Sequence, residues 1–187
     1  MPDVYSTFLP VLLAAVAQTG GPVLELGAGY YSTPALTALL SRTHRFLTTF
    51  ETDAAWLAEV RQVCPETEIH HYVHAPDLCA ALEIGFGLDG PDHDHLDAKQ
   101  YSVCLVDHRP PPREGVECPR GLDLALLWDL ADVFVCHDTE PGLEVLYAWD
   151  RFALLGPQPK FTYEYRCPFG PWTTTLSKFP LQGWPFP

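Results

Sequence analysis

The sequence predicts an α/β protein whose doubly wound, mostly parallel sheet has seven strands, helices on both faces and an antiparallel hairpin at one edge. Over the first two thirds of the 187-residue chain, short apolar runs alternate with stretches of helical periodicity. This alternation is typical of a parallel sheet covered by helices. The last two apolar runs have no helix between them, and the segment Cys167 to Pro171 joins them as a hairpin would. The length fits one domain over residues 1–187.

Each expected element follows from a local pattern. Asp53, for example, can cap the helix that Pro65 ends. Strands are expected at Pro22–Leu26, Arg45–Glu51, Glu68–Val73, Tyr101–Asp107, Asp132–His137, Phe161–Arg166 and Thr173–Lys178. Helices are expected at Pro10–Gln18, Pro34–Leu40, Asp53–Val63, Pro76–Ile84, Leu122–Leu130 and Leu143–Phe152.

Composition and charge indicate which binding partners and which cell compartment are expected for this protein. The chain has 24 acidic and 11 basic residues, a formal charge of -13, and such a surface repels phosphate backbones and anionic lipids. We therefore expect no nucleic-acid and no membrane partner. The apolar run Val11–Ala17 is too short to span a bilayer and lacks the flanks of a secretory signal. The six cysteines include no CxxC pair, which indicates reduced thiols and a cytoplasmic protein.

The loop after the first predicted strand indicates a ligand site. The strand carries the carboxylate Glu25, turns through Gly27 and Gly29 and enters a helix that Ser32 or Thr33 can cap. Glycines at these positions allow backbone torsions and close ligand approach that a Cβ would obstruct. Glu51 ends the second strand, 22 residues after Gly29, where a carboxylate can accept hydrogen bonds from the ribose of an adenosine-containing ligand.

These residues carry a resemblance to a family. Glu25-Leu-Gly27-Ala-Gly29 together with Glu51 resembles the first two motifs of class I S-adenosylmethionine (SAM)-dependent methyltransferases, and the edge hairpin is similar to that family's reversed terminal strand. The Ser32-Thr33 form is similar to a small-molecule-modifying branch, although Tyr31 replaces a frequent third glycine. The resemblance implies SAM as cofactor, with Glu25 at its amino end, Gly27 and Gly29 beneath its backbone and Glu51 on its ribose. The full implied donor-binding set is Glu25, Gly27, Gly29, Tyr31, Ser32, Thr33, Glu51 and Asp107.

Two strand ends supply candidates for catalysis. Asp107 and His108 follow the fourth strand, and His137 and Asp138 end the fifth, so all four should face the crevice beyond the carboxyl ends. A histidine can remove a proton from a hydroxyl or amine acceptor near neutral pH. We therefore take Asp107, His108, His137 and Asp138 as catalytic candidates.

Metal ligation is a competing interpretation of the same residues. Asp107 and Asp138 with a histidine could hold Mg²⁺ or Mn²⁺, which resembles the metal-dependent catechol-type O-methyltransferases. Thr139 stands where that group usually has an amide ligand, so we assign no metal ligands. The segment Asp92-His93-Asp94-His95 also suggests a metal, but topology places it at the opposite end of the sheet, as a solvated acidic loop.

Two further segments could complete the acceptor site. The proline-rich loop Arg109–Arg120 could close over the crevice, with Arg109 or Arg113 meeting a carboxylate, or simply cross the surface. Aromatic side chains of the hairpin could wall an acceptor pocket or pack against the sheet. They are Tyr163, Tyr165, Phe169 and Trp172.

The sequence thus predicts a SAM-dependent methyltransferase that transfers a methyl group to oxygen or nitrogen of a small-molecule acceptor. A homo-oligomer is expected if a second subunit completes the open acceptor site. Two alternatives stay open. The first is a non-catalytic methyltransferase-like binding or assembly module. The second is a nicotinamide-dependent oxidoreductase, whose glycine fingerprint Gly27-x-Gly29-x-x-Ser32 imitates.

Overall fold

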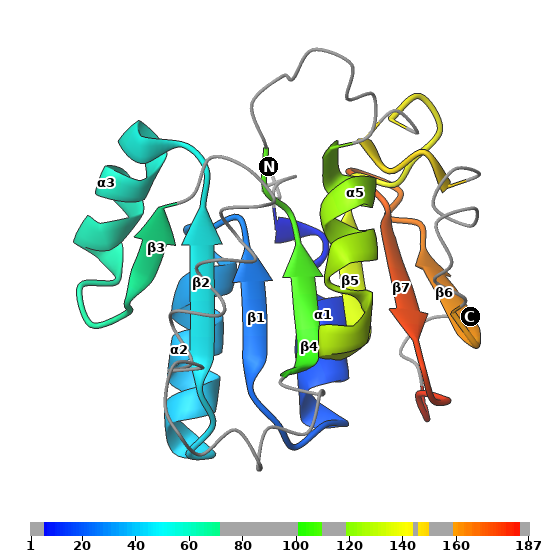
Figure 1. Ribbon diagram of the computed structural model, residues 1–187, viewed down its shortest axis with the longest axis horizontal. Coiled ribbons are helices and arrows are strands. Elements are labelled where there is room, and N and C mark those ends of the chain that lie inside the picture. The colour runs from blue at the N-terminus through cyan, green and yellow to red at the C-terminus, as the bar shows by residue number, and fades with distance from the viewer. Residues whose placement is uncertain (1–5, 72–100, 110–118, 144–145, 150–158, 184–187) are drawn as a thin grey trace.

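Seven strands form one sheet in the computed structural model, which describes residues 6–71, 101–109, 119–143, 146–149 and 159–183 (Figure 1). The sheet order is β3-β2-β1-β4-β5-β7-β6. All neighbours from β3 to β5 are parallel, whereas β7 runs antiparallel to both β5 and β6. The strand bounds are β1 Val23–Leu26, β2 Leu47–Glu51, β3 Ile69–His71, β4 Tyr101–Val106, β5 Ala131–His137, β6 Phe161–Tyr165 and β7 Thr173–Ser177.

Helices cover both faces of this sheet. On one face, α1 (Leu9–Ala17) and α2 (Ser32–Arg42) pack over alternate residues of the central strands, among them Val103, Leu105 and Val133. On the other face, α5 (Pro119–Leu126) and the short 3-10 helix η3 (Trp128–Leu130) pack over Cys104, Val106 and their neighbours. All residues of β1 and β4 are buried, as expected of strands covered on both sides. The predicted fold class is confirmed.

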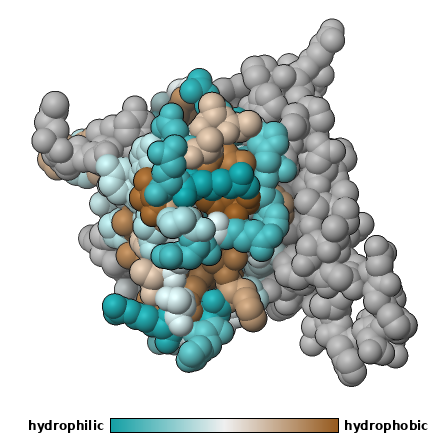
Figure 2. All heavy atoms as spheres, turned by 90° about the vertical axis from the view of Figure 1, so that its left-hand side faces the viewer, coloured by the Kyte–Doolittle hydropathy of each residue, from teal (hydrophilic) through white to brown (hydrophobic). Residues whose placement is uncertain are grey.

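The remaining helix, α3 (Ala54–Val63), follows β2 and packs beside β3. Asp53 caps it as predicted, because its Oδ1 accepts hydrogen bonds from the amides of Ala55 (2.8 Å) and Trp56 (3.1 Å). Figure 2 shows this edge of the molecule, where hydrophilic side chains surround a smaller hydrophobic area. A hollow of about 500 Å³ lies here, lined by residues of α3, β3 and their connection.

Two predicted helix starts are wrong. Helix α2 begins at Ser32, so Ser32 and Thr33 lie inside its first turn, and Tyr31 precedes the helix without a side-chain cap. Thr33 does not cap because its hydroxyl donates to Glu25. Helix α5 begins at Pro119, three residues before our expectation, since proline suits a first helical turn.

The predicted helix at 76–84 and half of the one at 143–152 lie outside the described residues, as does the acidic segment 92–95. Within the part of the chain that the structure describes, no helix has both the length and the apolar character to cross a bilayer. The four described cysteines form no disulfide bond with one another.

Candidate active site at the carboxyl ends of the strands

Glu25 lies in the middle of β1 with its side chain on the α2 face. It is completely buried, and its Oε2 accepts hydrogen bonds from the hydroxyls of Thr33 (2.9 Å) and Thr49 (2.8 Å). Burial raises the pKa of Glu25 to about 7, because the hydroxyls of Ser32, Thr49 and Thr33 offset only part of the desolvation. A buried carboxyl group that titrates near neutrality suits a site for a cationic ligand group.

Glu51 ends β2 and is also buried, with 4% of its surface exposed. Its Oε1 accepts hydrogen bonds from the amides of Thr52 (2.6 Å) and Asp53 (2.8 Å) at the start of α3. Burial raises the pKa of Glu51, and these amides with that of Ala28 act against the rise. The backbone therefore fixes one carboxylate oxygen of Glu51.

The turn between β1 and α2 depends on Gly27. Its φ of +98° lies in the left-handed region, and a Cβ at this position would come within 2.6 Å of the backbone of Asp107 and His108. The turn therefore lies directly against the end of β4. At Gly29 a Cβ would lie 3.0 Å from Oγ of Ser32, and the Gly29 amide donates to the Thr33 hydroxyl at 3.0 Å.

Aromatic residues brace the same turn from outside. The Tyr30 ring packs on Trp56 with centroids 4.6 Å apart, and its hydroxyl donates to Glu59 at 2.8 Å. The indole of Trp56 donates to the carbonyl of Ala28 at 2.7 Å. Tyr31 is 40% exposed, so this large residue lies at the surface.

Asp107, His137 and Asp138 meet where β4 and β5 end. Nδ1 of His137 lies 3.0 Å from Oδ1 of Asp107 and 3.4 Å from Oδ1 of Asp138. The two aspartate side chains are 22% and 23% exposed, whereas the imidazole is buried against Phe8 and contacts the Thr7 hydroxyl through Nε2 at 3.2 Å. Asp138 has a φ of +58°, a conformation that aspartate tolerates better than most residues.

His108 does not join this cluster. Its Nε2 lies 2.7 Å from Oδ2 of Asp123 on α5, and its side chain is 0% exposed. Burial lowers the pKa of His108, and Asp123 opposes that shift. The imidazole is therefore enclosed between β4 and α5, although our sequence prediction placed it beside the acceptor.

Arg120, which we expected in the preceding loop, is instead a buried residue of α5 that sequence reasoning missed. Its Nη1 lies 3.0 Å from Oδ2 of Asp138, and its Nη2 lies 3.6 Å from Oδ1 of Asp107. Burial lowers the pKa of Arg120, but Tyr147, Asp107 and Asp138 outweigh it, and the net pKa is raised. The sequence did offer one indication that Arg120 is buried: it lies three residues before Asp123, on the inward face of an amphipathic helix.

The ligand atoms of Asp107, His137 and Asp138 lie within 4.8 Å of one another, as a metal site requires. A divalent cation fits poorly here, because the Arg120 guanidinium already occupies the space between the two carboxylates. Nδ1 of His137 faces carboxylate oxygens and must carry a proton to bond with them, so its lone pair is not offered to a metal.

Two of the four hairpin aromatics pack against the sheet. Tyr163 and Tyr165 join the core beneath α1, and the Tyr163 hydroxyl accepts a hydrogen bond from the amide of Leu181 at 3.0 Å. Trp172 lies beneath the Arg166 guanidinium, 4.7 Å from its ring centroid, and Phe169 is 76% exposed. Arg109 is exposed, and its carbonyl accepts a hydrogen bond from the Thr52 hydroxyl at 3.0 Å. Residues 110–118 lie outside the described residues.

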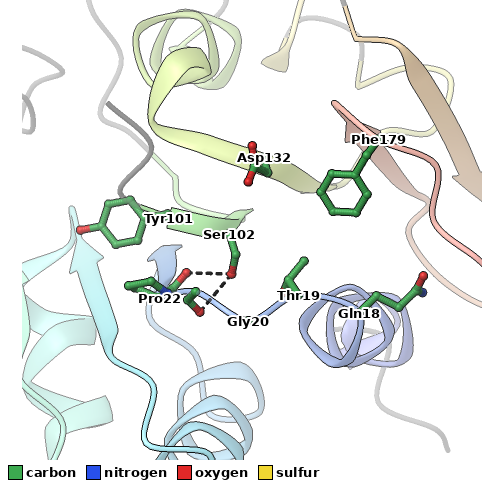
Figure 3. A pocket seen from close by; sticks show the side chains of 9 residues that line it. Gln18, Thr19, Gly20, Pro22, Tyr101, Ser102, Asp132 and Phe179 are labelled. Carbon is green, nitrogen blue, oxygen red and sulfur yellow. Dashed lines mark hydrogen bonds between the residues drawn. The ribbon is translucent and has the colours of Figure 1, made fainter. Parts of the chain in front are cut away.

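A separate cavity of about 330 Å³ lies at the amino ends of β4 and β5 (Figure 3). Tyr101, Ser102 and Asp132 line it from the strands, and Gln18 and Thr19 from the end of α1. Ser102 donates to the carbonyls of Gly21 and Pro22 in its wall at 3.0 and 3.1 Å. The cavity is at the opposite end of the sheet from the carboxylate cluster.

The strand order, the reversed β7 and the glycine turn together define the fold of class I SAM-dependent methyltransferases. The classical dinucleotide-binding order 3-2-1-4-5-6 has no reversed strand between β5 and the edge. No protein-family model and no curated protein sequence matches this chain.

Solved structures with the same fold include proteins named as methyltransferases. One is human methyltransferase-like protein 13 in complex with SAH, with a TM-score of 0.61, 16% identity, and 92% of this chain and 82% of that chain covered. Another is the human methyltransferase 10 domain containing protein, with a TM-score of 0.53, 10% identity and coverage of 96% and 85%. A third is the Methanococcus jannaschii fibrillarin pre-rRNA processing protein, with a TM-score of 0.55, 14% identity and coverage of 89% and 74%.

This last structure corrects one of our expectations. We excluded nucleic acid as a partner from the net charge of -13, yet the same fold occurs in a protein of pre-rRNA processing. Net charge is a sum over the whole surface, whereas RNA contacts depend on the local charge around the site. The exclusion is therefore wrong and is withdrawn.

Proposed function

We propose that this protein binds SAM at the carboxyl ends of β1 and β2 and transfers its methyl group to an oxygen or nitrogen acceptor held beside β4 and β5. The observation that carries the proposal is the Gly27 turn, which lies against the end of β4 and has a buried carboxylate on either side, Glu25 and Glu51. A turn of this kind leaves room for a ligand backbone across the strand ends.

Three features support donor binding. The backbone-anchored carboxylate of Glu51 can accept hydrogen bonds from the two ribose hydroxyls through its other oxygen. Glu25 accepts a hydrogen bond from Thr33 at the start of α2, which supports the role that we propose for it at the amino end of the donor. Gly27 and Gly29 in the turn after β1 have no side chain that would obstruct a ligand.

Bound SAM would supply a methyl group on a positively charged sulfonium. The acceptor attacks that methyl group in line with its bond to sulfur after the acceptor has lost its proton. Of the described groups at the ends of β4 and β5, Asp107 and Asp138 are partly exposed, whereas His137 and His108 are enclosed. We assign proton removal to Asp138 and the orientation of both carboxylates to His137, which donates from Nδ1. His108 then positions α5 through Asp123 and does not touch the acceptor.

Donor binding is tested by calorimetric titration of the full chain with SAM and with S-adenosylhomocysteine. Glu51→Gln removes the charge that the ribose hydroxyls require, so we expect about tenfold or more weaker binding of both ligands. Glu68→Gln is the matched control, since the Glu68 side chain is 84% exposed, and it should leave the affinity unchanged. Failure of the wild-type protein to bind either ligand would refute the proposal.

Catalysis is tested with Asp138→Asn, because asparagine also tolerates the φ of +58° and preserves the backbone. Loss of a general base costs about 100-fold or more in turnover, while SAM affinity should change less than about twofold. Parallel assays with small hydroxyl and amine compounds, RNA and protein as methyl acceptors test our prediction of a small-molecule acceptor. Equal turnover by D138N and wild type would assign the base elsewhere.

A further inference from the structure

We propose that Arg120 is the built-in cation of the Asp107 and Asp138 cluster and takes the position that a divalent metal would otherwise occupy. Its guanidinium bridges the two strand ends, with Nη1 at 3.0 Å from Asp138 and Nη2 at 3.6 Å from Asp107. The side chain is 6% exposed, so this cation is part of the interior. The inference goes beyond the proposed methyl transfer and does not depend on donor binding.

Backbone contacts fix the guanidinium in this position. Nε donates to the carbonyl of His108 at 2.6 Å, and Nη1 donates to the carbonyl of His137 at 2.9 Å. Arg120 therefore holds the chain just after β4 and the end of β5 as well as the carboxylates that follow them. The side chain cannot swing out to admit a metal without breaking these hydrogen bonds in a buried site, which is costly.

Tyr147 completes the enclosure. Its buried hydroxyl lies 3.0 Å from the carbonyl of Val106 and 2.7 Å from that of His137, and Nη1 of Arg120 donates to it at 3.4 Å. A Cβ at Gly121 would lie 2.1 Å from the Tyr147 carbonyl oxygen, so α5 and the Tyr147 backbone are in direct contact. The Arg120 side chain is thus confined by the ends of β4 and β5 and by Tyr147.

Charge leads to the same conclusion. The buried guanidinium reduces the charge of the two carboxylates from two negative charges to one, and an added divalent ion would meet the repulsion of Arg120 at short range. Asp107 also accepts a hydrogen bond from Nδ1 of His137 at 3.0 Å. Both aspartates are therefore paired with and oriented by groups of the chain itself, and Arg120 is a positioning residue.

Mn²⁺ binding to the full chain, measured by electron paramagnetic resonance, tests this assignment directly. We expect the wild-type protein to show no saturable binding at low-millimolar Mn²⁺, whereas Arg120→Ala should bind one ion about tenfold or more tightly than wild type. Adding Asp138→Asn to R120A should abolish that site. Arg166→Ala is the matched control, because Arg166 is an exposed arginine paired to Glu164, and it should behave as wild type.

Chemical rescue provides the second readout. Guanidinium ion at low-millimolar concentration should displace Mn²⁺ from R120A, while tetramethylammonium, which donates no hydrogen bonds, should not. If R120A does not fold, Arg120→Lys keeps the charge and should still exclude Mn²⁺. Saturable Mn²⁺ binding by wild type that Asp138→Asn removes would overturn the proposal, as would the absence of Mn²⁺ binding from folded R120A. Titration with S-adenosylhomocysteine on the same samples shows separately whether the donor proposal stands.

Discussion

At the scale of single residues, Glu25 is a carboxyl group whose protonation the fold changes between pH 4.5 and about 7. Its pKa rises from 4.5 to about 7 because burial penalises the carboxylate. The folded state therefore holds this proton more tightly than the unfolded chain between these two pH values. The stabilisation is complete below pH 4.5 and is lost as the pH rises to about 7, so Glu25 makes the protein less stable over that window.

Glu25→Gln should remove this dependence. Relative to wild type, the variant should gain stability as the pH rises from about 4.5 to about 7, by up to roughly 3 kcal/mol, and gain no more above that. Urea unfolding of both proteins across this range measures the difference, in which other titrating groups cancel. A difference that stays constant with pH would show that Glu25 is already ionised near pH 5.

Gly27 offers a second test at this scale. Gly27→Ala combines a φ of +98° with a Cβ 2.6 Å from the backbone of Asp107, so we expect a loss of at least about 2 kcal/mol of stability and loss of donor binding. Gly20→Ala is the matched control, because open space surrounds its Cβ, and it should change stability by less than about 1 kcal/mol. Thermal unfolding and titration with S-adenosylhomocysteine measure both effects. Equal stability and equal ligand binding of the two variants would mean that the turn can shift away from β4 and accept a Cβ.

At the scale of elements, Gly121 in α5 reverses the usual rule of helix propensity. Alanine normally stabilises a helix interior by about 1 kcal/mol over glycine. Here the new Cβ would lie 2.1 Å from the Tyr147 carbonyl oxygen, which is rigid backbone. We expect Gly121→Ala to destabilise the protein by about 2 kcal/mol or more, measured by urea unfolding. A stabilised variant would show that α5 does not lie against Tyr147.

The elements also show what sequence can and cannot predict. Strand β4 was predictable because the apolar run 103–106 marks a strand buried on both faces. The start of α2 was not, because Thr33 exchanges a capping role for a hydrogen bond to Glu25, a contact between β1 and α2 that only the packed fold creates. The start of α5 was missed because the proline that begins it, Pro119, also resembles the end of a proline-rich loop.

The same distinction holds for the candidate site. The sequence predicted that Asp107 and Asp138 end neighbouring strands, since both follow apolar runs. It did not predict that His108 turns towards Asp123 while His137 joins the carboxylates, because the direction of a side chain after a strand depends on what packs above it. Arg120 was missed for the same reason. Its partners are distant in sequence and meet only when α5 covers the sheet.

At the scale of the whole molecule, the formal charge of -13 should act on the proposed donor. SAM carries a sulfonium charge that S-adenosylhomocysteine lacks, and the proposed site is lined by Glu25, Glu51, Asp107 and Asp138. A negative field around such a site favours the charged ligand and is screened by salt. Donor and product should therefore differ in how salt affects their binding.

Raising the ionic strength from about 10 mM to about 150 mM shortens the screening length from about 30 Å to about 8 Å. We expect this change to weaken SAM binding by about two- to fivefold more than binding of S-adenosylhomocysteine, with adenosine, which is uncharged, as the control. Calorimetric titrations of all three ligands at both ionic strengths measure the effect. An identical salt dependence for SAM and S-adenosylhomocysteine would mean that the acidic surface does not reach the site. The internal cation Arg120 and the local arrangement of carboxylates would then determine ligand preference without the field of the whole protein.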